Sequence, residues 1–157
     1  MRIRLFLIVL SVSLLSACGP DTVMPPADFI WILNNKTEKS FIVKGSIQTD
    51  IHGIVQDHEI ESELKADENC TLLEISSDHS PFGKDYLTIF FGYISNGEIH
   101  LLEKENGNSV TTWKYGEDKP NKRTLFKKDH QSRNRLNQNQ EERNVIIIEC
   151  DITNNDL

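Results

Sequence analysis

The chain has 157 residues, with 24 Asp and Glu side chains against 17 Lys and Arg, and a formal net charge of −7 at pH 7. Nucleic-acid binding needs a concentrated basic face that displaces counterions from phosphates, so this acidic balance argues against a nucleic-acid partner. The length suits one domain with its own hydrophobic core and is too short for two comfortable domains.

The first seventeen residues have the three-part pattern of a secretory signal peptide. Arg2 and Arg4 come first, an apolar run follows over residues 5–15, and the small residues Ser16 and Ala17 close the pattern. As a helix, a run of this length spans only ~16 Å, about half of the hydrocarbon core of a bilayer. We therefore predict that residues 1–17 are a cleaved signal peptide and not a permanent membrane span.

The sequence Leu15-Ser16-Ala17-Cys18 resembles the bacterial lipobox, in which a cysteine thiol is acylated and the bond before it is cut. The resemblance implies that Cys18 opens the mature chain and carries the lipid that holds the protein on a membrane. Gly19 in place of Asp favours the outer over the inner membrane in the enterobacterial sorting scheme that this region resembles. Residues 18–27 contain three of the five prolines and predict an extended, lipidated tether.

From residue 28 onward, short apolar runs alternate with turn-forming residues, as is typical of β-strands. The expected strands cover residues 29–33, 40–48, 58–64, 70–75, 86–94, 98–103, 110–115 and 145–152. Residues 86–94 are apolar on both faces, which predicts a central strand, and Asn96-Gly97 predicts a hairpin turn into the next strand. No core strand can be drawn through residues 116–143, a polar insertion whose part 129–143 we expect to form a surface helix or a mobile loop.

Seven or eight short strands with hardly any amphipathic helix predict a mostly β fold for residues 28–157. We expect a single antiparallel β-sandwich of immunoglobulin-like or transthyretin-like kind, with a small closed barrel as the alternative. The segments ILNNKTEKSFIV and IECDITNNDL resemble the corresponding pieces of small Bacteroidetes lipoproteins that have a β-sandwich domain and no assigned function. This resemblance implies the fold and the envelope location, and it supplies no functional residues.

Cys70 and Cys150 are the only two cysteines that remain for a disulfide in an oxidising compartment. Cys150 alternates in phase with the apolar Ile148, which places it in the core. Cys70 is out of phase with Leu73 and Ile75, the apolar face of its own strand. The sequence therefore leaves the pairing of the two cysteines open.

Two further groups of side chains are candidates for binding. Trp113 and Tyr115 are in phase on one strand, so they form either a core face or an exposed aromatic binding face. Basic residues cluster in the polar insertion, where they form either a patch for an anionic head group or polymer or a solvated loop. The candidate patch consists of Lys119, Lys122, Arg123, Lys127 and Lys128.

The residue patterns of enzymes and metal sites are missing from the sequence. The five histidines have none of the spacings of zinc ligands, and the adjacent residues Asp78-His79-Ser80 cannot form a catalytic triad because their side chains diverge. There is no phosphate loop or dinucleotide fingerprint. We therefore expect no enzyme, no metal and no cofactor.

These expectations together describe a lipid-anchored, non-enzymatic binding module of the cell envelope, whose ligand is an envelope protein or a polymer. An inhibitor or immunity-type lipoprotein that blocks an enzyme or toxin is the alternative. A degradative enzyme whose acidic residues converge only in the fold is a third hypothesis.

Overall fold

The computed structural model describes residues 26–78, 85–118, 123–131, 133–138 and 144–157. The predicted signal peptide, most of the tether including Cys18, and the basic residues Lys119 and Lys122 lie outside these ranges. None of the described helices is long and apolar enough to cross a membrane.

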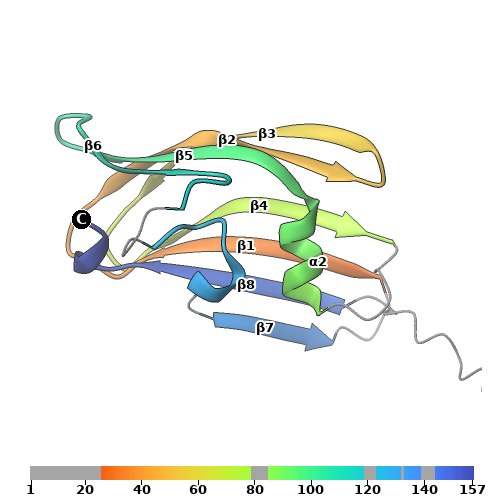
Figure 1. Ribbon diagram of the computed structural model, residues 1–157. Helices are drawn as coiled ribbons and strands as arrows, with labels where there is room; N and C mark the ends of the chain where they lie inside the picture. The colour runs from red at the N-terminus through yellow and green to blue at the C-terminus, as the bar shows by residue number, and fades with distance from the viewer. Residues whose placement is uncertain (1–25, 79–84, 119–122, 132, 139–143) are drawn as a thin grey trace, which may run out of the picture.

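The described chain forms two four-stranded sheets that pack face to face (Figure 1), which confirms the predicted β-sandwich. The first sheet has the order β4-β1-β8-β7 and the second the order β3-β2-β5-β6. Every neighbouring pair is antiparallel except β1 and β8, which run parallel. The strands are β1 (Ala27–Asn35), β2 (Phe41–Ile51), β3 (Ile54–Leu64), β4 (Asn69–Ser77), β5 (Ile94–Glu103), β6 (Ser109–Lys114), β7 (Arg133–Gln138) and β8 (Asn144–Ile152).

The core lies between the sheets and follows the two-residue period of the strands. In β1 every second side chain is buried, among them Phe29, Trp31 and Leu33. From the second sheet, Val43 of β2 and Ile99 of β5 are fully buried as well. The strands predicted from apolar alternation are therefore present, most of them longer than expected.

Residues 86–94 do not form the predicted central strand. Residues 86–93 form the helix α2 (Tyr86–Tyr93), which lies between the two sheets (Figure 1), and Ile94 is the first residue of β5. Asp85 caps the helix by accepting a hydrogen bond from the backbone N–H of Thr88 at 2.6 Å. A short run that is apolar on both faces suits a buried helix as well as a buried strand, so the periodicity could not separate the two. Phe90 of this helix packs edge-on against Trp31, with ring centroids 5.7 Å apart.

Asn96-Gly97 does not make the predicted hairpin turn, because both residues lie within the continuous strand β5. Gly97 instead allows the ring of Phe126 to lie close to the backbone of β5. A Cβ atom on Gly97 would lie 3.0 Å from two ring carbons of Phe126, so the absence of a side chain makes room for that ring. The connection between β5 and β6 contains Asn106-Gly107-Asn108, and Gly107 has a positive φ of 72° there.

The described residues of the polar insertion 116–143 do not form a long surface helix, and part of them is a strand. A single 3₁₀ turn, η1 (Lys128–His130), is followed by β7, which pairs with β8 at the edge of its sheet. An edge strand needs only one paired neighbour and tolerates a polar sequence, which is why no core pattern marked it. Leu125 and Phe126, the apolar residues of the insertion that lie next to each other, are buried in the core.

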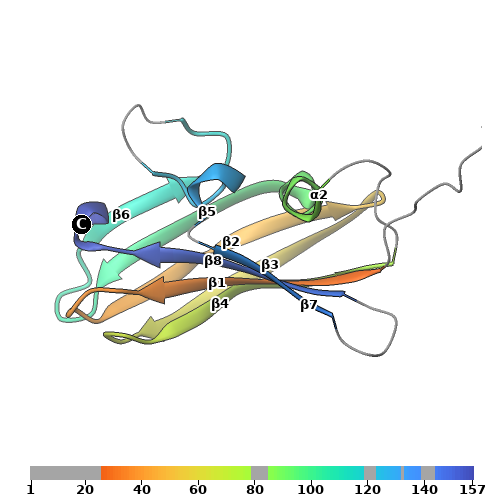
Figure 2. The same ribbon diagram turned by 90° about the horizontal axis from the view of Figure 1, so that it is seen from below.

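The two ends of the sandwich differ in what they carry (Figures 1 and 2). The end that we call the tether end holds the start of β1 at Ala27 and the hairpin between β2 and β3. The opposite, distal end holds the β1–β2, β3–β4 and β5–β6 connections and the C-terminal 3₁₀ turn η2 (Asn154–Asp156). A strand rises ~3.3 Å per residue, so the nine residues of β1 separate the two ends by ~30 Å.

Candidate functional site

Cys70 and Cys150 are free thiols, so the structure resolves the open question of their disulfide against pairing. Both cysteines are in register with Leu33, one on each side of it, because Cys70 lies on β4 and Cys150 on β8. Two strand spacings amount to ~9.5 Å, beyond the ~7 Å between Cα atoms that a disulfide allows. The strand β1 therefore keeps the two thiols apart.

A β-bulge explains why the phase of Cys70 was misleading. Trp31 pairs with Leu73 and Ile32 pairs with Thr71, so Leu72 is an extra residue on β4. The bulge resets the alternation, and Cys70 and Leu73 are both buried although three positions separate them. Cys70 and Cys150 are thus both core residues, and burial raises the pKa of each thiol to about 11.

The aromatic pair does not form the predicted binding face. Trp113 is opposite Ile99 on the inner face of its sheet and is only 7% exposed. Tyr115 is 40% exposed, and its ring packs edge-on against Phe126 at 5.9 Å between centroids. Of the two alternatives that the sequence allowed, Trp113 takes the core one.

The described members of the basic patch are each held by acceptors of the protein itself. Lys127 pairs with Asp118 at 2.6 Å, and that contact lowers the pKa of the Asp118 carboxyl. Lys128 pairs with Asp85 at 3.6 Å and donates to Thr88 Oγ1 at 3.1 Å, which joins η1 to the start of α2. Lys119 and Lys122 lie outside the described residues, and Arg123 points into the protein.

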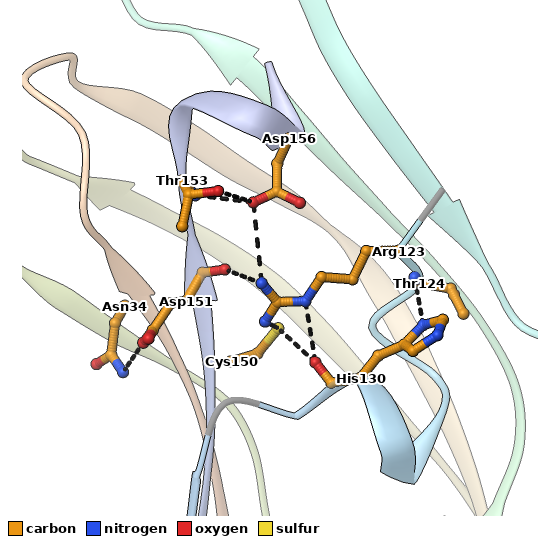
Figure 3. Close-up of polar contacts among 8 residues, drawn as sticks. All are labelled: Asn34, Arg123, Thr124, His130, Cys150, Asp151, Thr153 and Asp156. Carbon is orange, nitrogen blue, oxygen red and sulfur yellow. Dashed lines mark hydrogen bonds and ion pairs between the residues drawn. The ribbon is translucent and has the colours of Figure 1, made fainter. Parts of the chain in front are cut away.

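The Arg123 guanidinium is the centre of a cluster that joins three segments (Figure 3). Its Nε donates to the carbonyl oxygen of His130 at 2.9 Å, and one terminal nitrogen donates to the carbonyl oxygen of Asp151 at 2.8 Å. The other terminal nitrogen donates to Cys150 Sγ at 2.9 Å. The planar fork of Arg suits several acceptors at fixed angles, so this side chain fastens residues 123–131 to the end of β8. We call it the Arg123 clamp.

The Arg123 clamp has a structural and not a chemical role. The Arg123 charge lowers the pKa of the Cys150 thiol, but burial has the larger effect and the pKa is raised to about 11. Cys150 is therefore a protonated thiol at neutral pH and a poor nucleophile. The sequence groups Arg123 with its basic neighbours, since nothing in the local pattern shows that two of its acceptors, Cys150 and Asp151, lie on β8.

The distal end carries a charged hollow, which is the candidate functional site. It has a volume of about 340 Å³ and lies between the β1–β2 connection and the β5–β6 turn. We call it the distal hollow, and its lining residues are Glu38, Lys39, Ser40, Glu103, Lys104 and Glu105.

Ion pairs hold the rim of the distal hollow in place. Lys39 Nζ lies 3.5 Å from Glu103 Oε1, and Lys104 Nζ lies 2.6 Å from Glu63 Oε1 on β3. A hydrogen bond from the side chain of Asn106 lowers the pKa of the Glu103 carboxyl, and a hydrogen bond from Lys104 lowers that of Glu63. Both carboxyls are thus charged at neutral pH, and the rim presents both signs of charge to solvent.

Within the described ranges, no group of three or more His, Cys, Asp or Glu side chains is placed to hold a metal ion. Comparisons of the chain with protein-family models, with curated proteins and with solved structures find no match.

Proposed function

We propose that this chain is a lipid-anchored binding protein of the bacterial cell envelope, which works without catalysis and presents the distal hollow to an envelope protein or polymer. The observation that carries the proposal is that the start of the domain and the distal hollow lie at opposite ends of the sandwich. Strand β1 begins at Ala27, nine residues after the predicted lipidation site Cys18, and the distal hollow lies at the other end of the sandwich.

The geometry suits a partner that approaches from the side away from the membrane. A lipid on Cys18 places the tether end next to the bilayer, so the distal connections reach ~30 Å farther out. The hollow is lined by Glu and Lys side chains that are largely exposed, and such a surface favours a polar partner with charges of both signs. An envelope protein meets that description better than a polymer of one charge does.

The anchor follows from the resemblance of Leu15-Ser16-Ala17-Cys18 to a lipobox, and Gly19 favours the outer membrane. The test is to express the precursor and its Cys18→Ala variant in a related host and to fractionate the envelope. We expect the wild-type protein in the outer-membrane fraction and the variant in the soluble fraction. A soluble wild-type protein would refute the anchor.

Binding through the distal hollow is tested by charge reversal and crosslinking in intact cells. We expect a crosslinked adduct that the double variant Lys39→Glu/Lys104→Glu loses. The matched control is Lys44→Glu, because Lys44 also pairs with a Glu at 2.8 Å but lies on the outer face of the second sheet. Equal loss in both variants, or loss in neither, would contradict the hollow as the site. An adduct with a single enzyme or toxin would assign the inhibitor-type role.

A further inference from the structure

The hairpin between β2 and β3 exposes two large aliphatic side chains at its tip. Ile54 is 63% exposed and Val55 is 56% exposed, and they are the most exposed large hydrophobic residues among those described. Surface hydrophobic residues are common singly, but two in succession at a loop tip are open to a partner. We call residues 51–55 the hairpin tip.

The hairpin tip has a defined shape. His52 and Gly53 both have positive φ angles, 55° and 81°, as in the tight two-residue turns that match the twist of a hairpin. The backbone N–H of Gly53 donates to Asp50 Oδ1 at 2.9 Å, which holds the turn. Ile54 and Val55 are therefore held at the end of the hairpin by the turn itself.

The location of the hairpin tip limits which surfaces it can meet. It lies at the tether end of the sandwich, where β1 begins (Figures 1 and 2). A fully extended chain covers at most ~3.6 Å per residue, so the nine residues from Cys18 to Ala27 let the domain stand no more than ~30 Å from the lipid. The tether thus confines this end of the domain to the neighbourhood of the bilayer.

We infer that the hairpin tip rests on the lipid surface that holds the anchor, with Ile54 and Val55 at the boundary between head groups and acyl chains. Neighbouring side chains on a strand point to opposite faces, so a flat protein surface would cover only one of the two. A fluid lipid surface that meets the tip end-on covers both. Asp50 and Asp57 lie on the same hairpin, which favours a zwitterionic over an anionic surface.

This inference rests on the proposed lipid anchor, and the experiment reports on the two separately. The lipidated protein is reconstituted into phosphatidylethanolamine–phosphatidylcholine vesicles with or without brominated acyl chains, which quench Trp fluorescence on contact. The variant I54W is compared with L157W, since Leu157 is 41% exposed and lies at the distal end. The unsubstituted protein gives the background from Trp31 and Trp113, which are both buried.

We expect brominated lipid to quench the added emission of I54W and to leave that of L157W unchanged. Flotation of the protein with the vesicles measures the anchor independently. Failure to float would refute the anchor, and with it the inference. Flotation without quenching of I54W, or equal quenching of both variants, would overturn the inference and leave the anchor standing. Quenching of I54W that appears only in anionic vesicles would contradict the expected zwitterionic surface.

Discussion

At the scale of single residues, Gly45 shows how closely two strands approach. Gly45 is on β2 between its partners Ile60 on β3 and Ile99 on β5. A Cβ atom on Gly45 would lie 2.1 Å from the carbonyl oxygen of Glu98 and 2.9 Å from the Cα atom of Ile99. Both are backbone atoms of β5, so a side chain at this position would force the two strands apart.

We predict that Gly45→Ala lowers the free energy of unfolding by about 1–3 kcal/mol, the usual cost of overpacking in a core. Urea unfolding followed by circular dichroism measures the change. Gly92→Ala is the matched control, because Gly92 lies in α2 and a Cβ atom on it would meet nothing within 4 Å. In a helix Ala is favoured over Gly by about 1 kcal/mol, so this control should keep or raise the stability. Equal losses in both variants would contradict the argument.

The buried thiols give a prediction on pH. Burial raises the pKa of Cys70 and of Cys150 from the ordinary value of 9.0 to about 11. The folded state therefore keeps both protons between about pH 9 and pH 11, where the unfolded chain loses them. This contribution to stability is complete below pH 9 and is lost as the pH rises through the folded-state pKa.

The expected result is that the urea midpoint of the wild-type protein falls more steeply between pH 9 and pH 11 than that of Cys70→Ala/Cys150→Ala. Comparing the two proteins cancels the titration of Lys and Tyr side chains, which both share. Brief alkylation at pH 8, read by mass spectrometry, should modify neither cysteine unless urea is added. Rapid modification of the folded protein would show that the thiols are accessible and would refute their place in the core.

At the scale of elements, residues 123–131 pack against the core of the sandwich although they contain no strand. Leu125 and Phe126 bury their side chains, and the ring of Phe126 packs against Trp31 at 5.7 Å between centroids. Gln131 adds a hydrogen bond from Trp31 Nε1 at 3.1 Å. The Arg123 clamp joins the start of this segment to its end at His130 and fastens both to Asp151 of β8 through the same guanidinium.

We predict that Arg123→Lys lowers the stability by about 2 kcal/mol, within the range of hydrogen bonds to charged groups, because an ammonium cannot reproduce the angles of the guanidinium fork. Trypsin should also cleave after Lys127 and Lys128 more rapidly in this variant. Lys44→Ala removes an exposed ion pair and should change the stability by less than about 1 kcal/mol. A variant Arg123→Lys with wild-type stability and trypsin resistance would show that the clamp is dispensable.

At the scale of the whole molecule, the two sheets share one core and should unfold together. Trp31 lies on β1 in the first sheet and Trp113 on β6 in the second, and both are buried. The variants Trp31→Phe and Trp113→Phe each leave one fluorescent reporter, one per sheet. In each variant we expect the urea midpoint from fluorescence to coincide with the midpoint from circular dichroism. Separate midpoints within one variant would show that the sheets unfold independently.

The strands that pack against the core are the part of the fold that the sequence predicted best. Residues 29–33 are a short, continuous apolar run, and in residues 40–48 the apolar Phe41, Val43 and Ile47 share one face of a strand. The lipobox-like sequence around Cys18 is also a local feature, and the lipid anchor that it implies stays a prediction. Such features are legible because each depends on neighbours within a few positions of the chain.

Other elements depend on contacts between distant residues, and there the sequence misled. Residues 86–93 form a helix whose Phe90 packs on Phe29 and Trp31 of β1, and a side chain at Gly97 would collide with Phe126. Cys70 faces the core because a bulge on β4 resets the alternation against β1. No pattern within these segments shows which distant residues they contact, and those contacts determine their structure.

The sequence by itself determined the strand pattern of a β-sandwich and carries the prediction of a lipid anchor, because both depend on short-range order. Only the tertiary structure decided that Trp113 is buried, that Arg123 donates to the end of β8, and that the two cysteines do not pair. It also decided which loops share an end of the sandwich. Those properties depend on sheet order and register, which bring together residues many tens of positions apart.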